Sequence, residues 1–334
     1  MSKPARLSYL VMTLLLVLVG WLHLATLLLP GLFGYFALSL FNFRGHKIIA
    51  LSLYVALVVA IGLGLFHFSR QAYKVLPRII DTSIPAVVEF AEKQNIELPF
   101  TDYASLKSLA IAEAKERIVN VGQYTRQTVL RLVLIIIGLV VAAGIFLNAG
   151  IVIEGDPHAK KDSLYSQVGL ELGRRFQNFY QSFAIVMGAQ IVISAINTAL
   201  TAVFLLASGF PYVTEILVLT FLCGLLPIIG NILSNTLIIC VGFTVSPQLA
   251  LMALAFLVVI HKLEYFLNSK IIGHRIRNPM WLTLIGLVLG EKLMGIPGMI
   301  LAPVVLHYIK VESANFKAAA HVPASQGAPT ESIN

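Results

Sequence analysis

The sequence predicts an all-α polytopic membrane protein with about eight membrane segments, some broken or re-entrant, and with amphipathic helices outside the bilayer. The first observation is composition: 58% of residues are hydrophobic and 12% are charged, against about 45–50% and about 25% in soluble domains. The second is that Glu215 is the only charged residue between Phe176 and His261. The third is that several apolar runs reach the roughly 20 residues that a bilayer-crossing helix needs.

Other classes of protein fit the sequence poorly. The net charge of +8 could indicate nucleic-acid binding, but the basic residues lie in short loops between apolar runs, as the positive-inside rule describes. Cys223 and Cys240 lie within apolar runs and are interpreted as small core residues. There is no Cys/His ligand spacing, nucleotide-binding loop or nucleophile triad in the sequence. We therefore expect no metal, no cofactor, no nucleic-acid partner and no enzymatic activity.

Residues 1–69 are predicted to form the N-terminal membrane segments. Lys3 and Arg6 precede an apolar run at 7–29, which we interpret as a retained membrane helix that ends at Pro30. Residues 32–43 form a run of only 12 residues, too short to cross comfortably as a straight helix. Residues 48–68 form a clear crossing.

Residues 70–131 are predicted to lie outside the membrane as two amphipathic helices. They hold nine Lys or Arg and seven Asp or Glu residues. Apolar residues at 79, 80, 84, 87, 88 and 91 fall on one helical face. Pro99 breaks this pattern, and Thr101 or Asp102 can cap a second helix.

Residues 132–311 are predicted to form the transport core. We expect crossings at 132–153 and 183–207, separated by a surface helix at 169–181 whose Arg174 and Arg175 face water. The tail at 312–334 is small and polar, which predicts disorder.

The run from Ile216 to His261 holds 46 residues without Asp, Glu, Lys or Arg. A single helix of that length would measure about 69 Å, more than twice the roughly 30 Å hydrocarbon core. Pro227–Gly230 and Ser246–Pro247 supply breaks, so the run holds two or three segments. Three crossings are favoured, because they place the basic patch at 262–278 on the same side as the N-terminus.

The side of the membrane that holds the N-terminus and the basic patch is predicted to be cytoplasmic and to hold the C-terminus as well. Residues 70–131 are predicted to lie on the extracytoplasmic face. After the basic patch, residues 280–309 are interrupted by "GEKLMGIPG". Each half is too short to span well, which predicts a re-entrant hairpin.

A polar stripe and a helix break are candidates for a transport path. Polar residues at spacings of 4, 3 and 4 share one face of the 183–207 helix; these are Gln190, Ser194, Asn197 and Thr201. Pro227 and Gly230 break the next run, and Asn231, Ser234 and Asn235 follow. Transporters place binding sites at such breaks. The alternatives are hydrogen bonds between helices and an ordinary surface turn.

Ionisable residues near the membrane are candidates for coupling or gating. His261, Glu264 and Asn268 share one helical face through i, i+3, i+7 spacing, and carboxylate and imidazole groups can exchange protons. Alternatively, Glu264 pairs with a neighbouring cation at the interface. Glu215, at the start of the 216–261 run, suits a helix N-terminus and is a weaker candidate.

Residues 224–303 contain "PIIGN", "LEYFLNSKIIG", Pro279 and "GEKLMGIPGMILAP". With the long amphipathic segment, this pattern resembles the autoinducer-2 exporter (AI-2E) family of bacterial permeases, to about residue 311. The resemblance implies about eight membrane segments and a homo-oligomer in the bacterial inner membrane. It also implies export of a small polar signal molecule by some members, and sodium/proton exchange by others. Candidate hinges within the resembling part are Gly273, Pro279, Gly295, Pro297, Gly298 and Pro303.

Two departures from the family pattern bear on local helix geometry. Ser269 stands where members often have proline, and "NILSNTL" follows the Pro-x-x-Gly turn where more Gly and Pro are common.

Three hypotheses for function follow. The first is a gradient-driven or facilitative exporter of a small polar metabolite or signal molecule. The second is a cation/proton antiporter. The third is a membrane scaffold that docks partners through 70–131.

Overall fold

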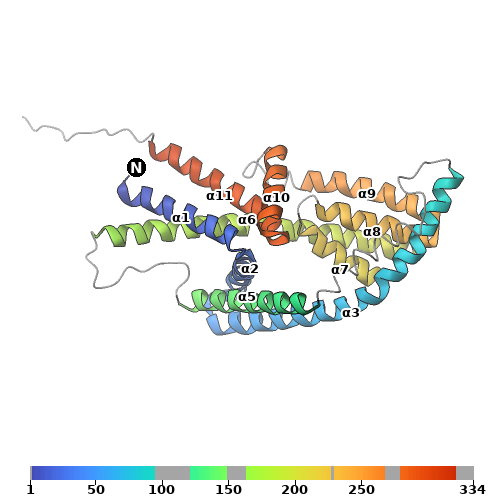
Figure 1. Cartoon of the computed structure of the whole chain (residues 1–334), viewed down its shortest axis with the longest axis horizontal. Helices are drawn as coiled ribbons and strands as arrows, with labels where there is room; N and C mark the ends of the chain where they lie inside the picture. The colour runs from blue at the N-terminus through green and yellow to red at the C-terminus, as the bar shows by residue number, and fades with distance from the viewer. Residues whose placement is uncertain (1, 95–120, 149–162, 227–228, 268–278, 321–334) are drawn as a thin grey trace, which may run out of the picture.

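The computed structural model describes residues 2–94, 121–148, 163–226, 229–267 and 279–320. Within these ranges the chain is helical and contains no β-strand, which confirms the predicted all-α class. The helices are α1 (Lys3–Trp21), α2 (Ala25–Phe41), α3 (Lys47–Lys93), α5 (Val121–Leu147), α6 (Leu164–Ala207), α7 (Val213–Gly224), α8 (Ile229–Val245), α9 (Pro247–Leu267), α10 (Met280–Met294) and α11 (Ile296–Ala320) (Figure 1).

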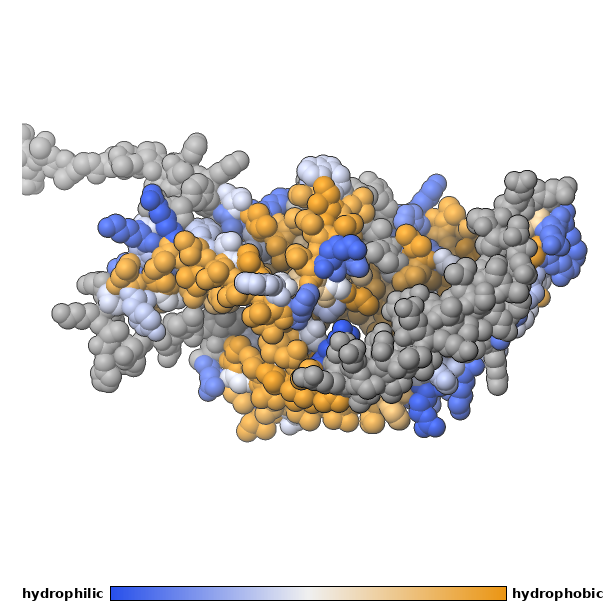
Figure 2. Space-filling model, viewed as in Figure 1, coloured by the Kyte–Doolittle hydropathy of each residue, from blue (hydrophilic) through white to orange (hydrophobic). Residues whose placement is uncertain are grey.

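The outer surface of the helices is apolar. Five helical segments are long and apolar enough to cross a membrane: Lys3–Trp21, Lys47–Val75, Thr128–Leu147, Leu164–Ala207 and Pro247–Glu264. Hydrophobic side chains cover the visible surface over α1, α2 and α5 (Figure 2), and some, such as Val140 at 65% exposure, are far from buried. A protein in water rarely exposes so much contiguous apolar surface. The structure therefore supports a multi-pass membrane protein.

The first apolar run forms two helices, so the single predicted helix at 7–29 is wrong. α1 ends at Trp21, and His23 adopts a left-handed backbone conformation with φ 52°. α2 begins at Ala25 and continues through Pro30 to Phe41. The turn lets Ala25 and Leu29 pack with Phe183 in the main core cluster, a tertiary contact that an apolar pattern does not reveal.

α2 crosses α5 at close range because glycine occupies the contact. A Cβ atom added to Gly138 would lie 2.3 Å from the backbone oxygen of Leu27. Small residues at such contacts let membrane helices approach closely. α3 joins this pair through Tyr54, whose hydroxyl donates to the Leu139 carbonyl over 3.0 Å.

α3 runs without a break from the predicted crossing into the predicted amphipathic segment. Val75, Ile79 and Ala91 are buried, and Val75 and Ile79 belong to a core cluster with residues of α6, α7, α8 and α9. The apolar face predicted near 79–91 therefore exists, but it continues the helix of the crossing. The second amphipathic helix predicted after Pro99 lies outside the described residues.

α6 is one helix of 44 residues, about 66 Å long. The predicted surface helix at 169–181 and the crossing at 183–207 are therefore two parts of one continuous rod. Arg174 is exposed as predicted, with 72% of its side chain accessible, but Arg175 is buried with 10% accessible. The expectation that Arg175 faces water is wrong, because acidic groups inside the protein hold it.

The long uncharged run belongs to three helices, α7, α8 and α9. The favoured prediction of three crossings is not confirmed, because among the described residues of this run only Pro247–Glu264 is long and apolar enough to cross a membrane. α7 has only 12 residues, about 18 Å, so it cannot cross a roughly 30 Å core alone. α7 runs antiparallel to the second half of α6, and α8 returns beside it (Figure 1). The turn between α7 and α8 thus lies beside the middle of α6.

α10 and α11 form the predicted hairpin. Gly295 makes the turn, with φ 66°. The backbones of Gly290 and Gly298 pack in direct contact: a Cβ atom added to Gly298 would lie 1.9 Å from the Gly290 carbonyl oxygen. α11 continues to Ala320. The predicted disordered tail from 312 is therefore wrong for residues 312–320, since Glu312 is buried at 6% exposure against α6.

Candidate functional site: a helix break between α7 and α8

The break between α7 and α8 gathers polar groups from α6, α7, α8 and α9. α6 supplies two donors. The Gln190 amide donates to the Gly224 carbonyl over 2.6 Å, and the Ser194 hydroxyl donates to the Phe221 carbonyl over 2.7 Å. The last four carbonyls of a helix have no partner within it. The polar stripe on α6 therefore satisfies two carbonyls that the end of α7 leaves free.

Glycine makes the turn compact. A Cβ on Gly224 would lie 2.3 Å from the Ser194 hydroxyl, and a Cβ on Gly230 would lie 1.7 Å from the Cys223 carbonyl oxygen. Gly230, a predicted transport-path residue, is the second residue of α8. The start of α8 therefore abuts the end of α7 directly, and a larger residue at 230 would force them apart.

A carboxylate from α9 reaches the start of α8. The Asn231 amide donates a short hydrogen bond to the Glu264 carboxylate, and both side chains are half-buried. The structure thus brings together two residues that the sequence assigned to different roles, the path and the coupling group. Gln190, Ser194, Gly230, Asn231 and Glu264 are hereafter the break site.

The other two residues of the polar stripe, Asn197 and Thr201, are buried, and an Asn197 oxygen has no hydrogen-bond partner among the described residues. Asn197 is 6% exposed and Thr201 is 2% exposed. Within the described part of the chain, Asn197 Oδ1, Thr198 Oγ1 and Thr220 Oγ1 are buried without a hydrogen-bond partner. Buried polar atoms are nearly always satisfied, and transmembrane segments hold them at a cost. These oxygens are suited to accept hydrogen bonds from water or a solute.

Several predicted site residues lie apart from these contacts. His261 is exposed, and Asn235 and Glu215 are half-buried on α8 and on the first turn of α7. Pro279 is the N-cap of α10. Gly295, Pro297, Gly298 and Pro303 all belong to the α10–α11 hairpin. Pro227, Asn268 and Gly273 lie outside the described residues.

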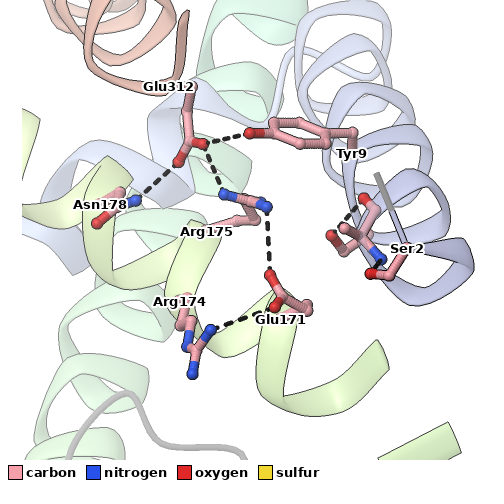
Figure 3. A network of polar contacts seen from close by, with 9 residues as sticks. Ser2, Tyr9, Glu171, Arg174, Arg175, Asn178 and Glu312 are labelled. Carbon is pink, nitrogen blue, oxygen red and sulfur yellow. Dashed lines mark hydrogen bonds and ion pairs between the residues drawn. The ribbon is translucent and has the colours of Figure 1, made fainter. Parts of the chain in front are cut away.

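A second polar cluster, absent from the sequence-based expectations, joins α1, α6 and α11 (Figure 3). Glu312 accepts hydrogen bonds from Arg175 over 2.7 Å, from the Tyr9 hydroxyl over 2.8 Å and from the Asn178 amide over 2.8 Å. Arg175 also pairs with Glu171 over 3.2 Å, and its guanidinium lies 3.9 Å above the Tyr9 ring. These five residues are hereafter the Arg175 cluster.

The Arg175 cluster connects one end of each of the helices α1, α6 and α11. Its charges balance locally, because Arg174 also pairs with Glu171. The Glu171–Arg175 spacing of i, i+4 was visible in the sequence as a helical ion pair. The contact with Glu312 was not, because 137 residues separate the two partners.

Comparisons of the sequence with known proteins identify the family of this chain. The profile of the AI-2E family transporters matches residues 7–317. A protein of Bacillus subtilis (strain 168) named "Putative transport protein YdbI" is 27% identical over 125 residues, which cover 37% of this chain and 36% of that protein. The chain thus matches about a third of that relative's length. Because the family match spans nearly the whole described helical assembly, the chain belongs to the AI-2E family of transporters and is a membrane permease.

Proposed function

We propose that the protein exports a small polar metabolite or signal molecule, and that the cargo passes the break site. The observation that carries this proposal is the hydrogen bond between Asn231 and Glu264 at the α7–α8 break. The bond brings a carboxylate of α9, a helix long and apolar enough to cross a membrane, beside the start of α8. In membranes, non-helical backbone is tolerated only against protein or a water-filled cavity.

The break site can recognise a polar solute through donors and acceptors on three helices. Glu264 offers carboxylate oxygens and Asn231 an amide, while Gln190 and Ser194 of α6 hold the end of α7 in place through hydrogen bonds to its carbonyls. The unmatched oxygen of Asn197 lies further along the same stripe. A transporter needs such groups to replace the water that a solute loses on leaving solution.

Cation exchange for protons is the second candidate. It is favoured by the neutral partner of Glu264, since within the described part of the chain its carboxylate bonds to an amide and to no Lys or Arg. A carboxylate at membrane depth that is held by a neutral amide can bind either a cation or a proton. Sodium-dependent dequenching of a pH dye in everted vesicles would identify this activity.

The orientation of the chain follows from its charged end. The start of α1, the start of α6 and the end of α11 lie together (Figure 1), and they carry Lys3, Arg6 and Arg174. The positive-inside rule places such an end in the cytoplasm. We therefore propose that both termini are cytoplasmic and that part of 70–131 is extracytoplasmic. From membership of the family, we further propose that the protein is a multi-pass homo-oligomer in the bacterial inner membrane.

Replacing Glu264 with glutamine is expected to lower export at least about tenfold, because hydrogen bonds to charged groups contribute about 1.5–3 kcal/mol. The measurement compares intracellular and extracellular metabolite pools in a deletion strain that expresses each variant. The exported solute should accumulate inside the deletion strain and return to normal with the wild type.

Glu291→Gln is the matched control, because Glu291 is an exposed acid at the end of α10 and far from the break site in sequence. It should restore export fully, and both variants should reach the membrane in equal amounts. Full restoration by Glu264→Gln would remove the carboxylate from the mechanism.

A further inference from the structure

A groove of about 1180 Å³ lies between α1 and the α10–α11 hairpin, and Phe179 of α6 also lines it. It exceeds the roughly 300–1,000 Å³ of ordinary small-molecule pockets. Its walls are almost wholly apolar and include Leu16, Leu289, Leu293, Leu301 and Val305. A small polar cargo would find few partners there, so this groove is distinct from the break site.

The groove is polar at one end only. Arg6, Tyr9, Glu312 and Ser313 line that end, which is the end where the helix termini gather. Tyr9 and Glu312 are engaged in the Arg175 cluster, where both Glu312 oxygens accept hydrogen bonds. They are therefore unavailable to pair with a ligand of either charge.

Arg6 is the charged group that remains available. Its side chain is exposed and makes no ion pair or side-chain hydrogen bond with any other described residue. The two carboxylates of the Arg175 cluster are balanced by Arg175 and by the neighbouring Arg174, so Arg6 leaves this end of the groove positive. Its guanidinium can bind a phosphate through paired hydrogen bonds.

We propose that the groove binds an anionic phospholipid, with an acyl chain between α1 and α10 and the phosphate on Arg6. α1 is 19 residues long, about 28 Å, so its groove-lining face can accompany a chain through one leaflet of a roughly 30 Å core. Basic sites between membrane helices on the cytoplasmic side are suited to anionic headgroups. A phospholipid is the expected occupant, because its phosphate complements the charge of Arg6 at one end and its acyl chain suits the apolar walls along the rest of the groove.

Native mass spectrometry of the full chain, with added phosphatidylglycerol or phosphatidylcholine, tests the proposal. The wild type should retain phosphatidylglycerol in preference to phosphatidylcholine. Arg6→Gln should lower phosphatidylglycerol retention about fivefold, as expected for one basic residue at a lipid surface, and leave phosphatidylcholine retention unchanged. Arg174→Gln is the control, because Arg174 is an exposed cation at the same end that does not line the groove.

A second variant tests the apolar part of the groove. Gly20 lines it, and a Cβ at that position would meet no atom within 4 Å. Gly20→Leu should therefore add apolar volume to the groove and reduce retention of both lipids.

Equal retention of the two lipids by the wild type would overturn the proposal, and so would an Arg6→Gln variant that matches Arg174→Gln. If Gly20→Leu instead shifts the protein to fewer subunits with lipid retention unchanged, the groove is an interface between copies and the lipid proposal fails. None of these results depends on export, so failure here and failure at Glu264 are distinguishable.

Discussion

Arg175→Met is expected to destabilise the protein by about 3–5 kcal/mol, because removing one partner of a buried ion pair leaves the other charge uncompensated. Glu312 would remain only 6% exposed, with Tyr9 and Asn178 as donors but no cation. Three helix ends meet at this carboxylate, so α1 and α11 should loosen together. Denaturant titration in detergent micelles would measure the loss.

Two controls separate the buried pair from loss of charge in general. Arg174→Met removes the same charge from an exposed neighbour, and exposed pairs contribute about 0–1 kcal/mol. The double variant Arg175→Met/Glu312→Met should recover much of the lost stability, since apolar replacements of a buried pair are often tolerated. If Arg175→Met were as stable as Arg174→Met, the Arg175 cluster would not hold the helix ends.

Gly230→Ala is expected to abolish most export and to lower stability by more than the roughly 1–3 kcal/mol of ordinary overpacking. The new Cβ would lie 1.7 Å from the Cys223 carbonyl oxygen, and a backbone atom cannot move aside as a side-chain tip can. The start of α8 must shift, which moves Asn231 away from its hydrogen-bond partner Glu264 on α9. Export assays and thermal unfolding of the purified variant would show both effects.

Gly62→Ala is the matched control for this substitution. Gly62 lies in the part of α3 that is long and apolar enough to cross a membrane, and a Cβ there would meet no atom within 4 Å. Alanine should be neutral or slightly stabilising at that position, because it is the better helix former. Export by Gly230→Ala at the level of Gly62→Ala would show that close contact at the break is dispensable.

The sequence predicted helix content and segmentation well where composition decides them. The length of the uncharged run and its Pro and Gly residues predicted two or three segments where α7, α8 and α9 lie, and the glycine-rich interruption predicted the α10–α11 hairpin. The turn at His23 was not predictable, because it interrupts an unbroken apolar pattern and depends on how α2 packs. The continuity of α6 was missed because a change in polarity along a helix resembles a boundary.

The break site was predictable residue by residue but not as an assembly. Helical spacing placed Gln190 and Ser194 on one stripe, and the Pro-x-x-Gly motif marked the break. Their meeting depends on α7 ending beside the middle of α6, which local pattern does not encode. The role of Glu312 could not be predicted from the sequence. The residue follows an apolar run near the predicted tail, and it contacts Arg175 only in the folded chain.

The central claim, that the break site faces an aqueous route, is tested most directly by thiol accessibility. Asn231→Cys and Ile232→Cys are compared in a Cys223→Ala/Cys240→Ala background, with a membrane-impermeant thiol reagent applied to intact membranes from either side. Ile232 is the adjacent residue and is 62% exposed on the apolar outer surface. We predict rapid labelling at 231 and little at 232, because a thiol ionises and reacts in water and not in lipid. Labelling at 231 no faster than at 232 would contradict the account.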